Sequence, residues 1–264
     1  MDKYDSKAAA RIDRTYQTPE IVHQRLRTLA ALGLRQGESI LDAGCGTGLL
    51  LEQEALAVGA KGRAAGLDSS ADMLAHAEAR CATLGQVTLQ QGSVDTLPFD
   101  DASFDALSCT QTLLYVEQLE QALREYHRVL KTGGRVAIIE TDWGGAILNS
   151  PDIALTQAIF NSWSDVVANP YLARRLTPLL RAAGFVAIRV EAIPVVNASY
   201  TENSFSAGML EGFTRSALKQ QIITEEQATA WHAEISELAE RDEYFFCVNR
   251  FLITAIKQGQ SQSR

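Results

Sequence analysis

Cysteine is scarce in this chain, and the few cysteines that it has are dispersed. None of them forms the C-x-x-C pair of structural zinc sites and thiol redox centres, since they are Cys45, Cys81, Cys109 and Cys247. The sequence also lacks a signal peptide and any apolar run long enough to span a bilayer. We therefore expect no metal site and no membrane association, and we predict a cytoplasmic protein with reduced thiols.

Positive charge is in deficit as well. The 264 residues include 24 Lys and Arg against 32 Asp and Glu, which gives a net charge of −8. Proteins that bind nucleic acids or anionic membranes usually present a basic surface. The balance therefore favours a small-molecule partner and no nucleic acid. A hydrophobic content of 46% supports one domain with an elaboration.

Glycine, in contrast, gathers in one short stretch. The run Asp42-Ala43-Gly44-Cys45-Gly46-Thr47-Gly48 follows apolar residues typical of a buried strand, and the leucines at 49–51 begin a helix. Glycines allow positive φ and a close approach of a ligand to the backbone. The amides at the start of the helix favour an anionic group. The stretch therefore predicts a ligand-binding loop between a strand and a helix.

The spacing of these glycines bears on the ligand. A dinucleotide motif G-x-G-x-x-G that began at Gly44 would need glycine where Leu49 stands, which disfavours a nicotinamide-dependent oxidoreductase. The pattern Asp-x-Gly-x-Gly-x-Gly instead resembles the first motif of class I S-adenosylmethionine-dependent methyltransferases, in the type 11 branch similar to ubiquinone and menaquinone biosynthesis enzymes. The resemblance covers residues 36–143. It implies that the loop lies beneath the methionine part of S-adenosylmethionine and that Asp42 orders the site around the amino group.

A second acid follows one helix and one strand later. Gly62–Leu67 is typical of a strand, and Asp68 ends it at the edge of the sheet where the glycine loop also lies. An acid there can accept hydrogen bonds from both ribose hydroxyls of an adenosine group, and the alternative is a helix-capping acid. Ser69 stands at the start of the next helix beside the same site. Met73 either walls the adenine or belongs to the core.

The segment Gly92–Phe99 resembles the adenine-contacting motif of the family. The resemblance places Ser93, Val94 and Asp95 at the cofactor, with Asp95 as the acceptor for the adenine amino group. A single acceptor next to an amide donor is well suited to specify a neutral amino-purine. The alternative for Asp95 is an exposed turn.

The predicted fourth strand, Phe104–Cys109, leads into Thr110 and Gln111. Ligands gather at the carboxyl ends of strands in open α/β sheets, so we expect these two residues to line the methionine end of the cofactor. Methyltransferases of DNA or RNA base amino groups carry an Asn/Asp-Pro-Pro-aromatic signature at this point. This chain has Thr-Gln-Thr-Leu instead.

Three residues are candidates for the catalytic side of the site. The predicted fifth strand runs into Asp142 and Trp143, where an acceptor would lie beside the methyl group. Asp142 would orient or deprotonate the substrate, and Trp143 would form an apolar wall or a cation–π face; alternatively, Asp142 caps a turn and Trp143 fills the core. Tyr16, on the N-terminal helices, is a candidate for gating, and the alternative is that its ring packs.

The order of these elements predicts an α/β fold with a doubly wound, mostly parallel seven-stranded sheet, similar to the Rossmann-like methyltransferases. An insertion before the last strand would carry an apolar inner face, which favours an acceptor with apolar bulk. The predicted parts are N-terminal cap helices at 1–35, a cofactor-binding core at 36–196 and 242–257, a helical substrate lid at 197–241 and a disordered tail at 258–264.

These patterns predict transfer of a methyl group from S-adenosylmethionine to a small molecule by in-line displacement. Two alternatives share the cofactor half of the site. A protein or nucleic-acid methyltransferase would have a broad, charged groove, and a non-catalytic regulatory module would bind the cofactor without transferring the methyl group. The patterns do not distinguish a monomer from a homodimer, or oxygen, nitrogen and carbon as the methylated atom.

Overall fold

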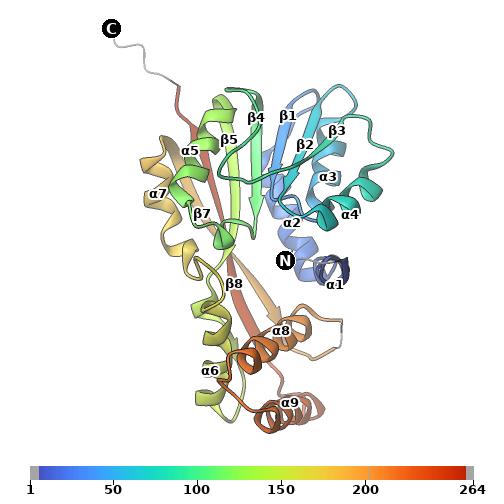
Figure 1. Cartoon of the computed structure of the whole chain (residues 1–264), viewed down its shortest axis with the longest axis vertical. Helices are drawn as coiled ribbons and strands as arrows, with labels where there is room; N and C mark the ends of the chain where they lie inside the picture. Colours follow the sequence, from blue (N-terminus) through green and yellow to red (C-terminus); the bar gives the residue numbers. More distant parts are fainter. Residues whose placement is uncertain (1–5, 202, 260–264) are drawn as a thin grey trace.

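The protein is built around one mixed β-sheet (Figure 1). The structure is a computed structural model that describes residues 6–201 and 203–259. The strand order is β3-β2-β1-β4-β5-β8-β6, and β7 pairs with β8. The strands are β1 (Ser39–Ala43), β2 (Arg63–Asp68), β3 (Val87–Gln91), β4 (Phe104–Thr110), β5 (Leu130–Thr141), β6 (Ile147–Leu148), β7 (Phe185–Asn197) and β8 (Phe246–Lys257).

The doubly wound, mostly parallel sheet predicted from the sequence is confirmed. Strands β1 to β5 are parallel, and β8 runs antiparallel to β5, β6 and β7. The sheet has eight strands and not seven, because the two-residue strand β6 pairs with the first residues of β8. Of the predicted disordered tail, residues 260–264 lie outside the described part of the chain.

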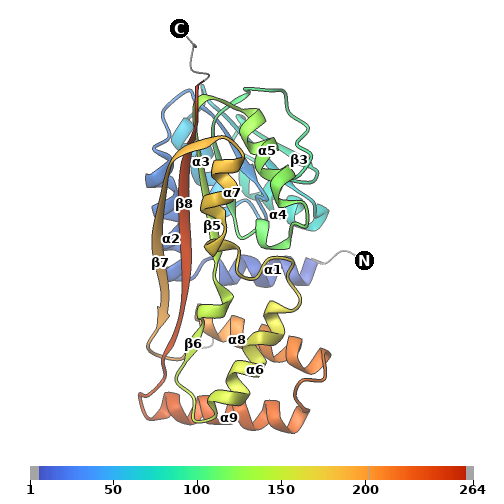
Figure 2. The same ribbon diagram turned by 90° about the vertical axis from the view of Figure 1, so that its left-hand side faces the viewer.

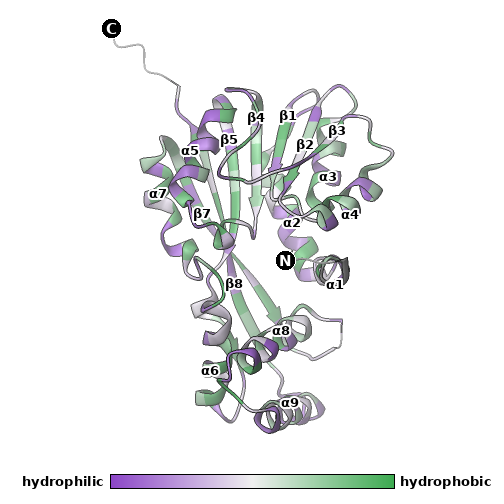
Figure 3. Ribbon diagram, in the orientation of Figure 1, coloured by the Kyte–Doolittle hydropathy of each residue, from purple (hydrophilic) through white to green (hydrophobic). Residues whose placement is uncertain are grey.

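Alternating residues of the central strands form two separate cores on the two faces of the sheet. Ile40 and Ala106 belong to the core that α2, α3 and α4 cover, whereas Leu41 and Leu107 belong to the core beneath α5 and α7. This is the pattern of strands that are buried on both faces, and Figure 3 shows them as hydrophobic. The covering helices are α2 (Pro19–Leu32), α3 (Leu49–Val58), α4 (Ala71–Cys81), α5 (Leu119–Val129) and α7 (Leu176–Ala182).

Strands β7 and β8 extend beyond the rest of the sheet into a helical lobe (Figures 1 and 2). A third core joins the lobe to these strands, through Phe213 and Trp231 of the helices and Val195 and Val248 of the strands. The lobe contains two helices of the predicted lid together with α6, which precedes the predicted boundary at 197 and packs on α8. Its helices are α6 (Ile153–Ser164), α8 (Phe205–Lys219) and α9 (Glu225–Glu240).

The N-terminal helix α1 (Ser6–Thr15) lies crosswise between the sheet and the lobe (Figure 2). Asp13 holds it there, because its Oδ1 atom accepts hydrogen bonds from Thr47 Oγ1 and Arg80 Nη2, both at 2.7 Å. Thr47 belongs to the glycine loop, so α1 is tied directly to the predicted cofactor site.

The described residues contain neither a helix suited to cross a membrane nor a cluster of metal-ligating side chains. Over 6–201 and 203–259, none of the helices combines the length and apolarity that a membrane crossing needs. The same ranges contain no group of three or more His, Cys, Asp or Glu side chains arranged to hold a metal ion.

Replacing Trp231 with alanine tests how much the lobe core contributes to stability. Its side chain is fully buried, and its Nε1 atom donates to Thr156 Oγ1 of α6 at 2.9 Å. We expect Trp231→Ala to lower the free energy of unfolding by about 3–5 kcal/mol, measured by urea denaturation. The exposed Thr229→Ala on the same helix should stay within about 0.5 kcal/mol of the wild type. Equal effects of the two changes would contradict this view of the lobe.

Candidate active site

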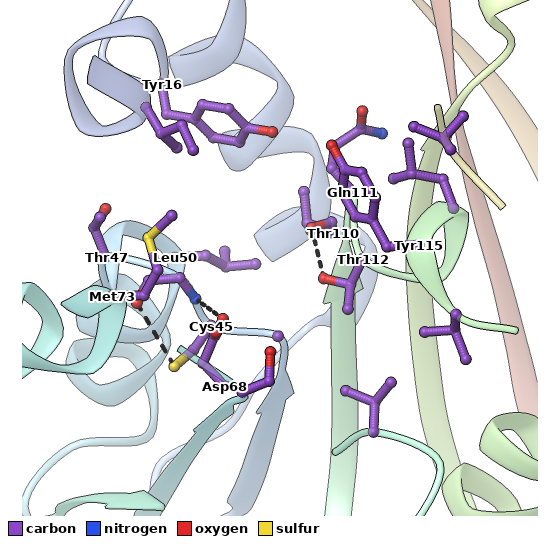
Figure 4. Close-up of a pocket in the computed structure, with 18 of the residues that line it drawn as sticks. Tyr16, Cys45, Thr47, Leu50, Asp68, Met73, Thr110, Gln111, Thr112 and Tyr115 are labelled. Atoms are coloured by element: carbon purple, nitrogen blue, oxygen red, sulfur yellow. Dashed lines mark hydrogen bonds between the residues drawn. The ribbon is translucent and has the colours of Figure 1, made fainter. Parts of the chain in front are cut away.

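A cavity of ≈ 720 Å³ opens at the carboxyl ends of the parallel strands, between the sheet, α1 and the helical lobe (Figure 4). Ligands bind at this edge in open α/β sheets. The predicted site residues that line it are Tyr16, Asp42, Gly44, Gly46, Asp68, Ser69, Met73, Ser93, Val94, Asp95, Thr110, Gln111 and Trp143. Two other predicted site residues, Gly48 and Asp142, do not line this cavity.

The glycine loop has the conformation that its sequence requires. Gly44, Gly46 and Gly48 have φ values of 85°, 53° and 79°. A Cβ atom on Gly44 would lie 2.1 Å from Thr112 Oγ1, so this position is closed to side chains. A Cβ atom on Gly48 would lie 3.0 Å from Ala77 of α4. Gly48 therefore serves the packing of α3 against α4, and not the cavity wall.

Asp68 is fixed at the end of β2 by the loop itself. Its Oδ2 atom accepts a hydrogen bond from the Gly46 amide and its Oδ1 atom from the Ser70 amide, both at 2.9 Å. Burial raises the pKa of Asp68, and these backbone hydrogen bonds oppose the rise. A carboxylate oxygen can accept more than one hydrogen bond, so both oxygens keep accepting capacity for a ligand in the cavity.

Two further carboxyl groups are buried together beneath the loop. Asp42 accepts a hydrogen bond from Ser108 Oγ at 3.2 Å. Burial raises the pKa of Asp42 to about 7, the bond from Ser108 opposes this, and the charge of Asp68 adds to it. Glu54 of α3 is fully buried, and its carboxylate oxygens have no hydrogen-bond partner in the described part of the chain. Burial also raises the pKa of Glu54 well above its ordinary value, and the charge of Asp42 adds to this rise.

The predicted adenine end is formed by two segments beside β3. Ser93, Val94 and Asp95 follow that strand and line the cavity, with the Val94 side chain buried. Met73 lies in the first turn of α4, where its amide donates to the N-cap side chain of Ser70 at 3.4 Å. Its side chain is also buried and lines the cavity near Asp68, as Figure 4 shows.

The end of β4 is held in an unusual backbone conformation. Gln111 has a φ of 54°, which is uncommon for a residue other than glycine. Its Oε1 atom accepts from Thr141 Oγ1 at 2.7 Å, and its amide donates to Ile139 O at 2.8 Å. In Figure 4, Thr110, Gln111 and Tyr115 lie along one side of the cavity, and the ring of Tyr16 extends toward them from above. Strain of this kind is concentrated at functional sites.

Glu140 holds the loop after β4 by hydrogen bonds, although the sequence analysis did not single it out. Its Oε1 atom accepts from the amides of Thr112 and Leu113 at 3.2 and 2.8 Å. The carboxyl group is fully buried, and burial raises its pKa to about 8 in spite of these hydrogen bonds. It therefore fixes the loop after β4 largely as a neutral group at pH 7.

One residue that the sequence analysis missed is a buried arginine at the cavity. Arg250 of β8 is 1% exposed, and its Nη1 atom donates to Gln24 Oε1 of α2. The guanidinium lies 4.9 Å from the ring centre of Phe205 and 5.5 Å from that of Tyr16. A signal was present, because Arg250 occupies an inward position in the alternating pattern of a strand whose other inward residues are apolar.

Arg25 of α2 is a second arginine that the sequence analysis missed. It lines the cavity with 7% exposure and donates to Tyr16 O at 3.1 Å. Its Nε atom is buried and has no hydrogen-bond partner among the described residues. Its charged neighbours include Asp13 of α1 and Glu52 of α3, so it stands on the glycine-loop side of the cavity.

The two residues predicted after β5 have different surroundings. Asp142 accepts from Arg174 Nε at 2.6 Å and from Arg174 Nη2 at 2.9 Å, and it caps the short helix η2 (Trp143–Gly145). The structure therefore corrects its expected place, because the carboxylate faces Arg174 and not the cavity. Trp143 lines the cavity and makes edge-on contacts with Trp163 and Phe213, at centroid distances of 6.0 and 5.6 Å.

The raised pKa of Asp42 predicts a dependence of stability on pH. Its pKa rises from 3.8 in an exposed carboxyl to about 7 in the fold. Over this interval the folded protein binds the proton more strongly than the unfolded chain, so stability falls as the pH rises through the interval and levels off above it.

Asp42→Asn removes this titration. We therefore expect the free energy of unfolding of the variant to decline less steeply with rising pH than that of the wild type, measured without ligand by urea denaturation. The exposed Asp165→Asn should follow the wild-type profile. Parallel profiles for Asp42→Asn and the wild type would contradict the assignment.

Comparison with known proteins agrees with this geometry. Residues 41–138 match the family model of a methyltransferase domain. The chain is 39% identical over 158 residues to an uncharacterized 37.1 kDa protein in transposon TN4556 of Streptomyces fradiae, a match that covers 60% of this chain and 46% of the relative. It is 38% identical over 117 residues to demethylmenaquinone methyltransferase of Staphylococcus epidermidis, which covers 44% of this chain and 48% of that enzyme.

The chain thus spans about half the length of the curated relatives that it matches. Among solved structures, the phosphoethanolamine N-methyltransferase 2 of Haemonchus contortus in complex with S-adenosylmethionine superposes with a TM-score of 0.65 at 19% identity. The superposition covers 98% of this chain and 58% of that protein, and at this identity it shows the fold alone. Residues 41–138 are thus similar to a methyltransferase domain, and the fold of the described chain resembles that of a solved methyltransferase.

Proposed function

We propose that this protein transfers the methyl group of S-adenosylmethionine to a small-molecule acceptor with apolar bulk. One observation carries the proposal: a single cavity extends from Asp68 and the glycine loop to Trp143 and the helical lobe. We call the side with Asp68 and the glycine loop the first wall, or cofactor wall, and the side with Trp143 and the lobe the second wall, or acceptor wall. A cofactor on the first wall and an acceptor on the second would lie in the same cavity. A cavity of ≈ 720 Å³ is within the usual range for small-molecule sites.

The residues of the first wall fit the cofactor. Gly44 lets the loop backbone lie against Thr112 at the cavity wall, where a side chain would clash, and Asp68 presents an oriented carboxylate at the end of β2. Asp95 supplies an acceptor farther along the wall, and Arg25 supplies a buried, incompletely paired cation suited to the cofactor's carboxylate. When bound, S-adenosylmethionine supplies an electrophilic methyl group on a positively charged sulfur.

The chain's own contribution is to orient the acceptor and exclude water. Trp143, Trp163, Tyr115 and Met209 form an aromatic and apolar wall opposite the glycine loop, and α1 covers the cavity. Alignment of two reactants in such a site can contribute roughly 7–11 kcal/mol. Tyr16 and Trp143 line the cavity, and we propose that they face the acceptor. Asp142 is paired outside the cavity, so we do not assign it the role of a base.

The shape of the second wall favours a small molecule over a macromolecule. Its aromatic residues come from three separate segments, and Trp143 is 6% exposed. A protein or nucleic-acid substrate needs an open and charged surface. The relatives named demethylmenaquinone methyltransferase also support an apolar acceptor.

Two measurements test this function. Calorimetric titration with S-adenosylmethionine, S-adenosylhomocysteine and NAD should give micromolar binding of the two adenosyl ligands and none of NAD. Incubation with radiolabelled S-adenosylmethionine and a bacterial extract should then place the label in the solvent-extractable small molecules. Label in precipitated protein or nucleic acid would overturn the proposed acceptor class. Cofactor binding with no transfer to any fraction would favour a regulatory module.

Substitution of Asp68 tests the ribose contact that we propose for it. Asp68→Ala removes an oriented acceptor from a half-buried site, so we expect cofactor binding to weaken by about 1–3 kcal/mol in the same titration. Glu78→Ala is the control, because Glu78 is an exposed acid on α4 that does not belong to the cavity wall described above. An unchanged affinity for Asp68→Ala would remove Asp68 from this role.

A further inference from the structure

The acceptor side of the cavity contains several hydrogen-bond donors that the protein leaves unused. The buried Nε1 atoms of Trp143 and Trp163 and the buried Nε atom of Arg250 have no partner within residues 6–201 and 203–259. All three residues line the cavity. Buried polar atoms are rarely left unpaired unless a ligand or water satisfies them. A ligand that satisfies these atoms must present hydrogen-bond acceptors.

Arg250 is held firmly in this position. Its backbone lies in the ladder between β5 and β7, opposite Thr141 and Ile193. Its guanidinium is fixed by Gln24 on one side and by the rings of Phe205 and Tyr16 on others. The charge therefore cannot move to solvent without rearrangement of α2 or of the lobe.

No carboxylate of the described residues neutralises Arg250 directly. None of the ion pairs within 4.0 Å in this part of the chain includes Arg250. Glu140 raises the pKa of Arg250 only in its ionised form, and burial raises the pKa of Glu140 to about 8, so this carboxyl group is largely neutral at pH 7. A buried charge without an oppositely charged partner is costly, so its retention at a ligand cavity calls for an explanation.

The two buried arginines of the cavity both adjoin Tyr16, but their other neighbours differ. Arg25 stands among groups of α1, α3 and α4 on the glycine-loop side. Arg250 touches Phe205, at the start of the lobe helix α8, and its charge also acts on Tyr115. Arg250 therefore belongs to the acceptor side, where the unpaired indoles also lie.

We propose that Arg250 binds an anionic oxygen group, a carboxylate or a phosphate, on an otherwise apolar acceptor. The proposal rests on the proposed function and specifies the class of its substrate. Trp143 and Trp163 line the same cavity, and they would supply further neutral N–H donors to the acceptor and ring faces to its apolar part. Hydrogen bonds between a guanidinium and an oxyanion are stronger than neutral ones, so the charge selects an acid over its amide.

Matched naphthalene probes test this selection. Protein saturated with S-adenosylhomocysteine is titrated with 2-naphthoate, 2-naphthyl phosphate and the neutral 2-naphthamide. At least one anion should bind about tenfold more tightly than the amide, the scale of a hydrogen bond to a charged group. The anion that binds better identifies the carboxylate or the phosphate as the preferred group.

Substitutions then locate the selecting charge. Arg250→Met should abolish the preference for the anion, whereas Arg250→Lys should retain part of it. Arg215→Met is the matched control, because Arg215 is an exposed arginine of the same cavity, and it should leave the preference unchanged. Thermal melting establishes that each variant is folded. If Arg250→Met does not fold, Arg250→Lys is compared with Arg215→Met. A weaker preference for the anion in Arg250→Lys would support the proposal, and an equal preference in the two variants would contradict it.

Three outcomes would overturn the proposal. The first is wild-type protein that binds naphthoate and naphthyl phosphate no better than the amide, or binds neither. The second is a preference that persists in Arg250→Met. The third is a tenfold loss of S-adenosylhomocysteine affinity in Arg250→Met, which would assign Arg250 to the carboxylate of the cofactor. If the wild type fails to bind S-adenosylhomocysteine, the proposed function fails instead, and the probe titration without that ligand still tests Arg250.

Discussion

The hydrogen-bonded ladder of β8 is the constraint on which the rest of the molecule depends. This strand pairs with β5 over one part of its length and with β7 along nearly all of it. Its inward residues enter the core of the sheet at one end and the core of the lobe at the other, as Ile253 and Phe246 show. Arg250 lies between these two ends. The strand therefore sets where the lobe stands over the sheet and places one cation at their junction.

The two sides of the cavity differ in their electrostatics. Beneath the glycine loop, Asp42 and Glu54 are buried close together, and desolvation raises the pKa of both. On the lobe side, the buried charge is the cation of Arg250, surrounded by aromatic rings. Desolvation acts on both kinds of group, but the carboxyls relieve it by taking up protons, whereas a guanidinium stays charged. Each half of the cavity therefore keeps a buried guanidinium, Arg25 on the glycine-loop side and Arg250 on the side that we assign to the acceptor.

Much of the cofactor wall could be predicted because its residues follow directly from local sequence. Gly44 and Asp68 lie within or just after short strands, so their spacing along the chain places them at one edge of the sheet. The acceptor wall could not be predicted in the same way. Asp142 has the expected position after β5, but Arg174, 32 residues later, draws its carboxylate away from the cavity. Gly48 has the expected left-handed backbone conformation, and α4 packs so close to it that a Cβ atom there would lie 3.0 Å from Ala77; its contact with the cofactor stays a prediction.

The sequence by itself predicted the parallel strands of the sheet with the helices between them, the left-handed glycine loop and a resemblance that implies the class of cofactor, because each depends on residues close together in the chain. The tertiary structure decided the composition of the lobe and the charge of the acceptor wall. Helix α6 joins α8 and α9 only through long-range packing. Arg250 reaches the cavity only because β8 brings it beside Gln24 of α2, 226 residues away. Such contacts depend on how distant segments bury their surfaces together, and this information is not contained in local periodicity.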